Sequence, residues 1–63
     1  MNMDEMKKEI KAGHTVRIIS EPYILMTVES AALRTARCIW FDKNGILHKD
    51  DFTYPTLVLV NQN

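Results

Sequence analysis

Three side chains of this sequence could bind a soft metal ion: His14, Cys38 and His48. A structural zinc site needs four ligands, some of them only a few residues apart, and none of the three has such a neighbour. Cys38 stands in an apolar run, residues 38–41, where a free cysteine packs as a small hydrophobic residue. A cysteine nucleophile would also need a nearby histidine and an orienting group. We therefore expect no metal site, no cofactor and no catalytic residue.

The acidic residues also argue against an enzyme. Asp50 and Asp51 are adjacent, so on a strand they point to opposite faces and cannot act as a carboxylate pair. The two acids instead indicate either a solvated turn or a strand edge that repels foreign strands. No small-molecule substrate is indicated.

A nucleic-acid surface is the alternative function that the sequence suggests. Five basic residues and three aromatic residues could form it: Arg17, Arg34, Arg37, Lys43 and Lys49, with Tyr23, Trp40 and Tyr54. The same region holds five acids, and the whole chain has eight basic and eight acidic residues. Because phosphate neutralisation carries most non-specific affinity, we do not expect nucleic acid as the partner.

Length and composition predict one small globular domain. A chain of 63 residues hides only about 60% of its surface on folding, so its own core is marginal. One cysteine excludes an internal disulfide framework, and no apolar run reaches 18 residues. The first eleven residues are charged and contain no apolar stretch of a secretory signal. We expect a cytoplasmic protein without membrane contact.

The chain divides into a segment of helical periodicity and a segment of strand periodicity. In residues 1–12, Met3, Met6 and Ile10 share one side of a predicted short helix, with Gly13 at its end. Because ten residues are not helical alone in water, this segment is a helix only if it docks; otherwise it is a frayed arm. Residues 13–60 alternate apolar and polar positions, and residues 61–63 form a polar tail.

The alternation predicts five short antiparallel strands in a small, strongly bent barrel. Glu21-Pro22 should interrupt the first two strands, Asn44-Gly45 should form a hairpin turn, and Tyr54-Pro55 a tight turn. Leu47 and Phe52 have opposite parity, so we expect a bulge or a strand end between them. The expected strands cover 15–20, 24–29, 35–42, 46–49 and 57–60.

Both faces of the third strand are apolar, so both should be covered. The expected inner set is Val16, Ile18, Met26, Val28, Leu47, Phe52, Leu57 and Leu59. Cys38 and Trp40 lie on the face opposite to Ile39 and Phe41, and Trp40 suits either a core or an interface position. The cover is either the predicted helix or a second chain. The candidate interface is Met3, Met6, Ile10, Ile19, Leu25, Arg37, Trp40 and Phe41.

Three segments carry a family resemblance: Gly13-His14-Thr15-Val16-Arg17, Met26-Thr27-Val28 and Cys38-Ile39-Trp40-Phe41-Asp42, followed by Phe52 and Leu57. In this pattern, residues 13–60 resemble small bacterial proteins of the YodC-like type. His14 departs from the aspartate usual there, and residues 1–12 have no counterpart in the pattern. The resemblance implies an SH3-like barrel and supplies no activity.

We thus expect an all-β, SH3-like five-stranded antiparallel barrel with a short N-terminal helix. Its expected function is that of a non-catalytic binding module that acts through protein–protein contacts with a protein partner or by self-association. A nucleic-acid-associated barrel is the alternative.

Overall fold

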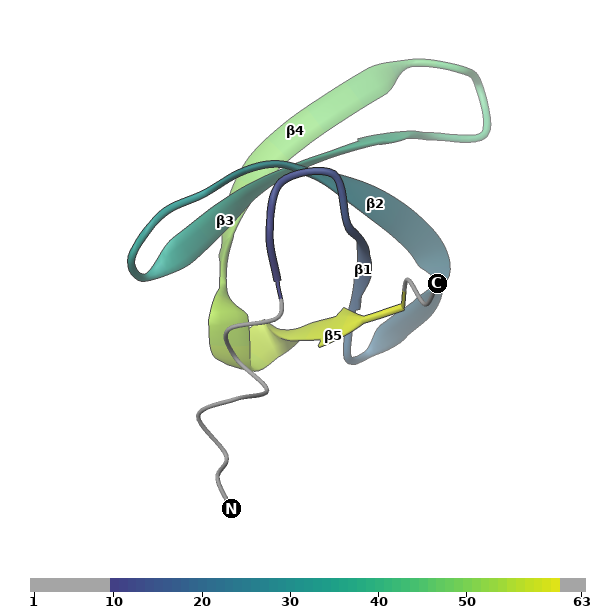
Figure 1. Cartoon of the computed structure of the whole chain (residues 1–63). Coiled ribbons are helices and arrows are strands. Elements are labelled where there is room, and N and C mark those ends of the chain that lie inside the picture. Colours follow the sequence, from purple (N-terminus) through teal and green to yellow (C-terminus); the bar gives the residue numbers. More distant parts are fainter. Residues whose placement is uncertain (1–9, 61–63) are drawn as a thin grey trace.

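The structure is a computed structural model that describes residues 10–60. These residues form five antiparallel strands of one sheet, in the order β4-β3-β2-β1-β5 (Figure 1). The strands are β1 (Thr15–Ile18), β2 (Glu21–Ala31), β3 (Thr35–Phe41), β4 (Leu47–Thr53) and β5 (Leu57–Leu59), with a 3₁₀ turn, η1 (Tyr54–Thr56), between the last two. Within this range, no ladder joins β4 to β5, so the sheet is curled but not closed. The all-β prediction is confirmed, and most of the predicted helix lies outside the described residues.

The curl of the sheet comes from β2, which pairs with β1 on one side and β3 on the other. The β2–β3 register shifts between Val28 and Ser30, which leaves Glu29 as an extra residue. The β1–β2 register shifts between Val16 and Ile18. An extra residue bends its strand and increases its twist, so one long strand can follow both sides of a small core.

The core lies inside the curl. Its most buried side chains come from four strands and the residue that precedes the first turn: Ile10, Val16, Met26, Val28, Ala36, Cys38 and Leu57. Around them pack the partly buried Ile18, Trp40, Phe52, Tyr54 and Leu59. The alternation therefore predicted most of the inner set correctly.

Two sequence predictions about strand interruptions are wrong. The β3–β4 ladder runs without a shift from the Thr35–Thr53 pair to the Phe41–Leu47 pair, so neither a bulge nor a strand end separates Leu47 from Phe52. Leu47 instead points out of the core and is 47% exposed. Pro22 does not end a strand but lies within β2. It falls where the β1–β2 register shifts, between the pairs Ile18–Glu21 and Val16–Met26, and there a missing donor is tolerated.

The turn between β3 and β4 is fixed by one acid and one glycine. The Asp42 Oδ1 atom accepts hydrogen bonds from the backbone N–H of Asn44 at 2.8 Å and of Ile46 at 3.0 Å. Gly45 has φ +81°, a conformation that costs other residues about 1–2 kcal/mol. The turn therefore sits where Asn-Gly predicts it, with only the glycine at positive φ.

A hydrogen bond joins two connections at the end of the sheet away from the β3–β4 turn. The Tyr54 hydroxyl in η1 donates to the Ala32 carbonyl at 2.5 Å, and this bond ties the β2–β3 turn to the connection between β4 and β5. The backbone there forms no helical turn at residues 31–33; Ala31 ends β2, and the Ala32 N–H donates to the Thr35 carbonyl. Among residues 10–60, no helix is long and apolar enough to cross a membrane.

Candidate interaction surface

The outer face of the sheet is organised in rows that cross the strands. Its middle row runs Lys49, Ile39, Thr27 and Thr15, because each is the register partner of the next. On one side of this row lie Arg37 and its partner Asp51. On the other side, toward the β3–β4 turn, the face becomes apolar.

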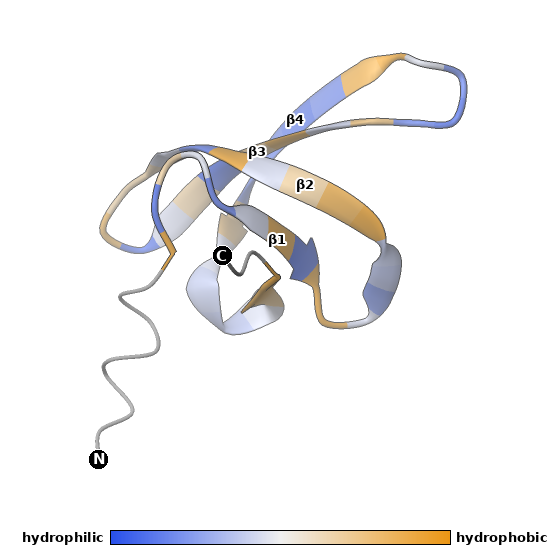
Figure 2. Ribbon diagram, turned by 45° about the vertical axis from the view of Figure 1, so that its right-hand side comes forward, coloured by the Kyte–Doolittle hydropathy of each residue, from blue (hydrophilic) through white to orange (hydrophobic). Residues whose placement is uncertain are grey.

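We call Leu25, Phe41 and Leu47 the outer apolar row. Phe41 and Leu47 are register partners across β3 and β4, and Leu25 of β2 lies two residues from Thr27, as Phe41 does from Ile39. Their exposed fractions are 54%, 68% and 47% for Leu25, Phe41 and Leu47. Figure 2 shows the same apolar character at the start of β4 and in the first half of β2. Three neighbouring strands thus present large apolar side chains to solvent.

A hollow opens beside this row because β2 and β3 separate there. Their ladder ends at the Thr27–Ile39 pair. Beyond it, residues 23–25 and residues 40–43 line an open hollow of about 450 Å³. Tyr23 stands at its rim, 92% exposed. The hollow gives the outer face of the curled sheet a depression that an apolar side chain can enter.

Trp40 lines this hollow and contacts two aromatic side chains. Its indole stacks on His48 with ring centroids 5.5 Å apart and an interplanar angle of 16°, and it meets Phe52 at 5.9 Å in a tilted contact. The His48 Nε2 atom lies 2.8 Å from the Asp42 Oδ2 atom. The hydrogen bond to His48, together with the N–H donors of Ile46 and Asn44, lowers the pKa of Asp42. This chain of contacts holds the end of the β3–β4 hairpin in one arrangement.

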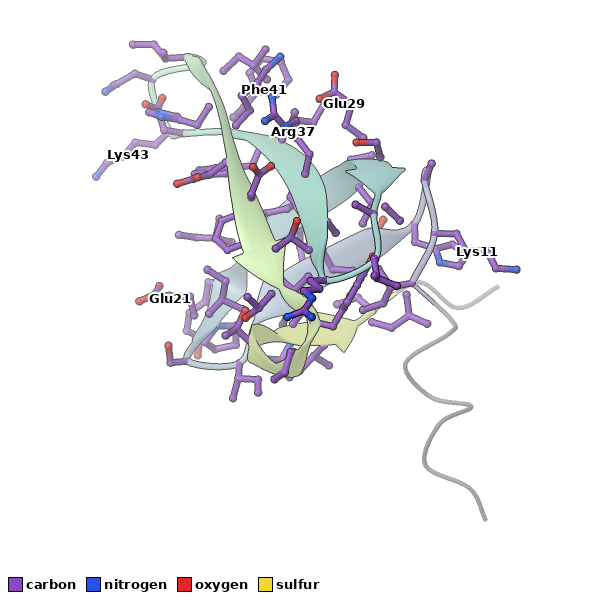
Figure 3. The ribbon with its side chains drawn as sticks, turned by 90° about the vertical axis from the view of Figure 1, so that its left-hand side faces the viewer. Lys11, Glu21, Glu29, Arg37, Phe41 and Lys43 are labelled. Atoms are coloured by element: carbon purple, nitrogen blue, oxygen red, sulfur yellow. The ribbon has the colours of Figure 1, made fainter. Side chains whose placement is uncertain are left out.

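Charged side chains of opposite sign form pairs on the same face, in the middle row and on its far side from the outer apolar row. Arg37 donates to Asp51 through Nε at 2.9 Å and through Nη2 at 3.3 Å, and the bond to Asp51 raises the pKa of Arg37. Lys49 Nζ lies 4.0 Å from Glu29 Oε2. Figure 3 shows Phe41, Arg37 and Glu29 on the same side of the molecule, with Lys43 at the hairpin end. Neither positive nor negative charge dominates this part of the face.

The structure brings some of the predicted interface residues together and separates others. Leu25 and Phe41 share the outer apolar row, and Arg37 lies on the same face. Trp40 is half-buried on the inner side, and Ile19, 57% exposed, follows β1. Ile10 is 9% exposed and belongs to the core. Met3 and Met6 lie outside the described residues.

Sequence reasoning missed Leu47 and the contact between His48 and Asp42. The signal was present, because pairing outward from the Asn-Gly turn places Phe41 opposite Leu47 and Trp40 opposite His48. Tyr23 was considered only as part of a nucleic-acid surface, although its parity already places it on the face of Leu25.

Other hollows lie within residues 10–60. An open hollow of about 690 Å³ is lined by Ile10, residues 31–34 and residues 53–55. Beneath Trp40 there is a cavity of about 60 Å³, lined mainly by Ile18, Ile24, Met26 and Phe52. Cys38 is fully buried, and burial raises the pKa of its thiol. Residues 10–60 contain no group of three acidic, histidine or cysteine side chains placed to hold a metal ion.

Comparisons of this chain with family models, with curated proteins and with solved structures give no match.

Proposed function

We propose that this chain is a non-catalytic binding module that contacts another protein surface through the outer apolar row. The observation that carries the proposal is the exposure of three large apolar side chains: the register partners Phe41 and Leu47, and Leu25, which lines the same hollow as Phe41. Single exposed apolar residues are ordinary, but a contiguous apolar patch bordered by polar groups is typical of an interaction site. The aromatic rim at Tyr23 adds the residue type that is enriched in such contacts.

We also propose that the curled sheet is an SH3-like barrel, as the resemblance to YodC-like proteins implies. The supporting features are the meander of four strands, the return of β5 to the free side of β1, and the short 3₁₀ turn before β5. In this proposal, the barrel is a rigid frame, and its outer face carries the function.

A protein partner suits this face better than nucleic acid does. Three basic side chains lie on or near this face: Arg37 and Lys49 are each paired with an acid, and Lys43 lines the hollow beside Phe41. Binding a phosphate would require breaking these pairs or adding charge repulsion from Glu29 and Asp51. An apolar row on a face of balanced charge instead matches the anatomy of a protein interface.

Site-specific photo-crosslinking tests the proposal. A photoreactive phenylalanine analogue is placed at Phe41 in one variant and at Leu33 in a control variant. Leu33 is 88% exposed but lies at the opposite end of β3, beyond Thr35, where it lines the separate hollow of about 690 Å³. After irradiation in cells, we expect protein adducts at position 41, identified by mass spectrometry, and few at position 33. Equal labelling of the two positions, or none at position 41, would contradict the proposed function.

A further inference from the structure

We infer that the hollow between residues 23–25 and residues 40–43 receives an extended segment of the partner protein, which adds to the free edge of β2 as a further strand. This inference rests on the proposed function and specifies the form of the partner segment. Its support comes from the backbone groups that face the hollow, from the absence of charge on this edge and from the apolar side chains beside it.

The backbone groups of Leu25 face the hollow. The Val28 N–H donates to the His14 carbonyl at 2.9 Å, and the Val28 carbonyl accepts from the Gly13 N–H at 2.8 Å, so the backbone groups of Val28 point away from β3. Successive residues of a strand direct these groups to opposite sides, so those of Thr27 and Leu25 point toward β3. The ladder to β3 ends at Thr27, which leaves the N–H and C=O of Leu25 without a strand partner among residues 10–60.

The same alternation extends to Tyr23. Ile24 and Met26 both line the cavity of about 60 Å³ inside the sheet, whereas Leu25 and Tyr23 are 54% and 92% exposed. The shift in the β1–β2 register therefore falls on the Glu21 side of Tyr23. The N–H and C=O groups of Tyr23 and Leu25 consequently form a free edge on a strand that is already extended.

Phe41 of β3 faces the same hollow from the opposite side. The Asp42 N–H donates to the Ile46 carbonyl at 3.0 Å, across the β3–β4 hairpin, so the backbone groups of Phe41 point toward β2. If the β2–β3 ladder continued by two residues, Leu25 and Phe41 would be its next pair of this kind. The hollow therefore takes the place of missing strand pairs, and a segment inside it lies between two strands.

The edge of β2 lacks the charges that protect the other long free edge of the sheet. Strand β4, at the end of the strand order, has a histidine, a lysine and two aspartates at positions 48–51, and charged residues on an edge oppose pairing with a foreign strand. Residues 23–25 are instead a tyrosine, an isoleucine and a leucine. Beyond Phe41, the opposite side of the hollow ends in the charged Asp42 and Lys43. The edge of β2 is therefore the one that accepts a strand.

An extended peptide backbone is the ligand that matches these groups. A strand offers donors and acceptors at the spacing of the edge, and this is how added strands bind to sheets. A phosphate offers acceptors only, and the backbone groups of a folded surface are already paired. Alternate side chains of the added strand lie beside Tyr23, Leu25 and Phe41, so the segment is apolar at these alternate positions.

Selection of short random peptides displayed on phage, with the full chain as the target, provides the first test. We expect the enriched peptides to have apolar residues at alternate positions. Replacing one peptide amide by an ester removes its N–H donor without adding bulk. In the tightest peptide, esters at the alternate positions that face β2 should weaken binding about tenfold, and esters at the intervening positions should weaken it much less.

A matched change in the chain itself provides the second test. A chain of 63 residues is short enough for chemical synthesis, so an ester can replace the amide of Leu25 in one variant and that of Leu33, in the β2–β3 turn, in a control. The Leu25 ester should weaken binding of the selected peptide about tenfold, and the control should not. Both should melt close to the original chain, since the Leu25 N–H has no strand partner in the free protein.

The outcomes separate this inference from the proposed function. A selection that enriches no peptide, esters that act equally at both sets of positions, or a Leu25 ester that binds like the control would each overturn the added strand. If position 41 then still crosslinks to a protein in cells, the proposed function stands, with a folded surface as the partner. If position 41 gives no adducts, the proposed function fails as well.

Discussion

Replacing Cys38 by serine should destabilise the fold without affecting any contact on the outer face. Cys38 is fully buried among Val16, Val28 and the other core residues. Its Sγ atom has only a weak contact, 3.8 Å from the Ala36 carbonyl oxygen. Because a C–O bond is shorter than a C–S bond, a serine hydroxyl remains beyond the distance of about 3 Å that an O–H donor needs.

The expected loss follows from this geometry. A buried hydroxyl without a partner costs about 1–3 kcal/mol. For a domain of this size, each kcal/mol lowers the melting temperature by about 4–8 °C. Urea unfolding should show a lower midpoint with an unchanged m-value, since the surface exposed on unfolding stays the same.

A matched Cys38→Ala variant distinguishes the polar cost from the loss of volume. Removing one heavy atom from a core costs about 1 kcal/mol, so alanine should destabilise less than serine. If serine is tolerated as well as cysteine, or if a thiol reagent rapidly modifies the native protein, Cys38 does not occupy a dry core and the reasoning fails.

Burial raises the pKa of this thiol. The unfolded chain therefore loses the proton first, and the free energy of unfolding should fall as the pH rises above the pKa of a free thiol.

Three further perturbations test the hairpin and the charge balance. The pKa of Asp42 is lowered, chiefly by the hydrogen bond to His48. The Asp42 carboxylate therefore stabilises the fold at neutral pH, and this stabilisation should disappear as acid protonates it. The Asp42→Asn variant should consequently show a flatter decline in melting temperature between about pH 6 and pH 2. Gly45→Ala should cost about 1–2 kcal/mol because φ is +81° there, while Asn44→Ala, at a position without positive φ, should change the denaturation midpoint much less. The equal numbers of acids and bases predict no sub-micromolar binding of duplex DNA in a fluorescence titration at about 150 mM salt.

The strands were predictable because burial has a period of two in this chain. Met26 and Val28, or Cys38 and Trp40, alternate with residues that face outward. The Glu29 bulge shifts this alternation on β2, so that Ser30 pairs with the exposed Arg37 and Ala31 with the buried Ala36. Hydrophobicity alone predicts a core position for Leu47, and this prediction is wrong, because Leu47 faces outward. Counting pairs from the turn would have placed it opposite Phe41.

The features that depend on how distant segments of the chain meet in the folded sheet could not be predicted. The separation of β2 from β3 beyond Thr27 depends on how a long strand bends, and the sequence shows no interruption there. The bond from Tyr54 to the Ala32 carbonyl joins residues 22 positions apart. Neither spacing nor composition encodes such a meeting, because it arises from the curl of the whole sheet.

The position of β1 in the sheet has a consequence for how the chain is synthesised. Three of the four ladders join strands that follow each other in sequence, but β1 also pairs with β5, the last strand. Val16 faces Leu59 across that ladder, so one flank of the core stays open until residues 57–59 have left the ribosome. The β2–β3–β4 meander can form earlier from local contacts, whereas the β1–β5 pairing carries the entropy of closing a loop of nearly the whole domain. Folding during translation should therefore finish in a single late step, and ribosome-stalled chains that end before Leu57 should remain sensitive to protease.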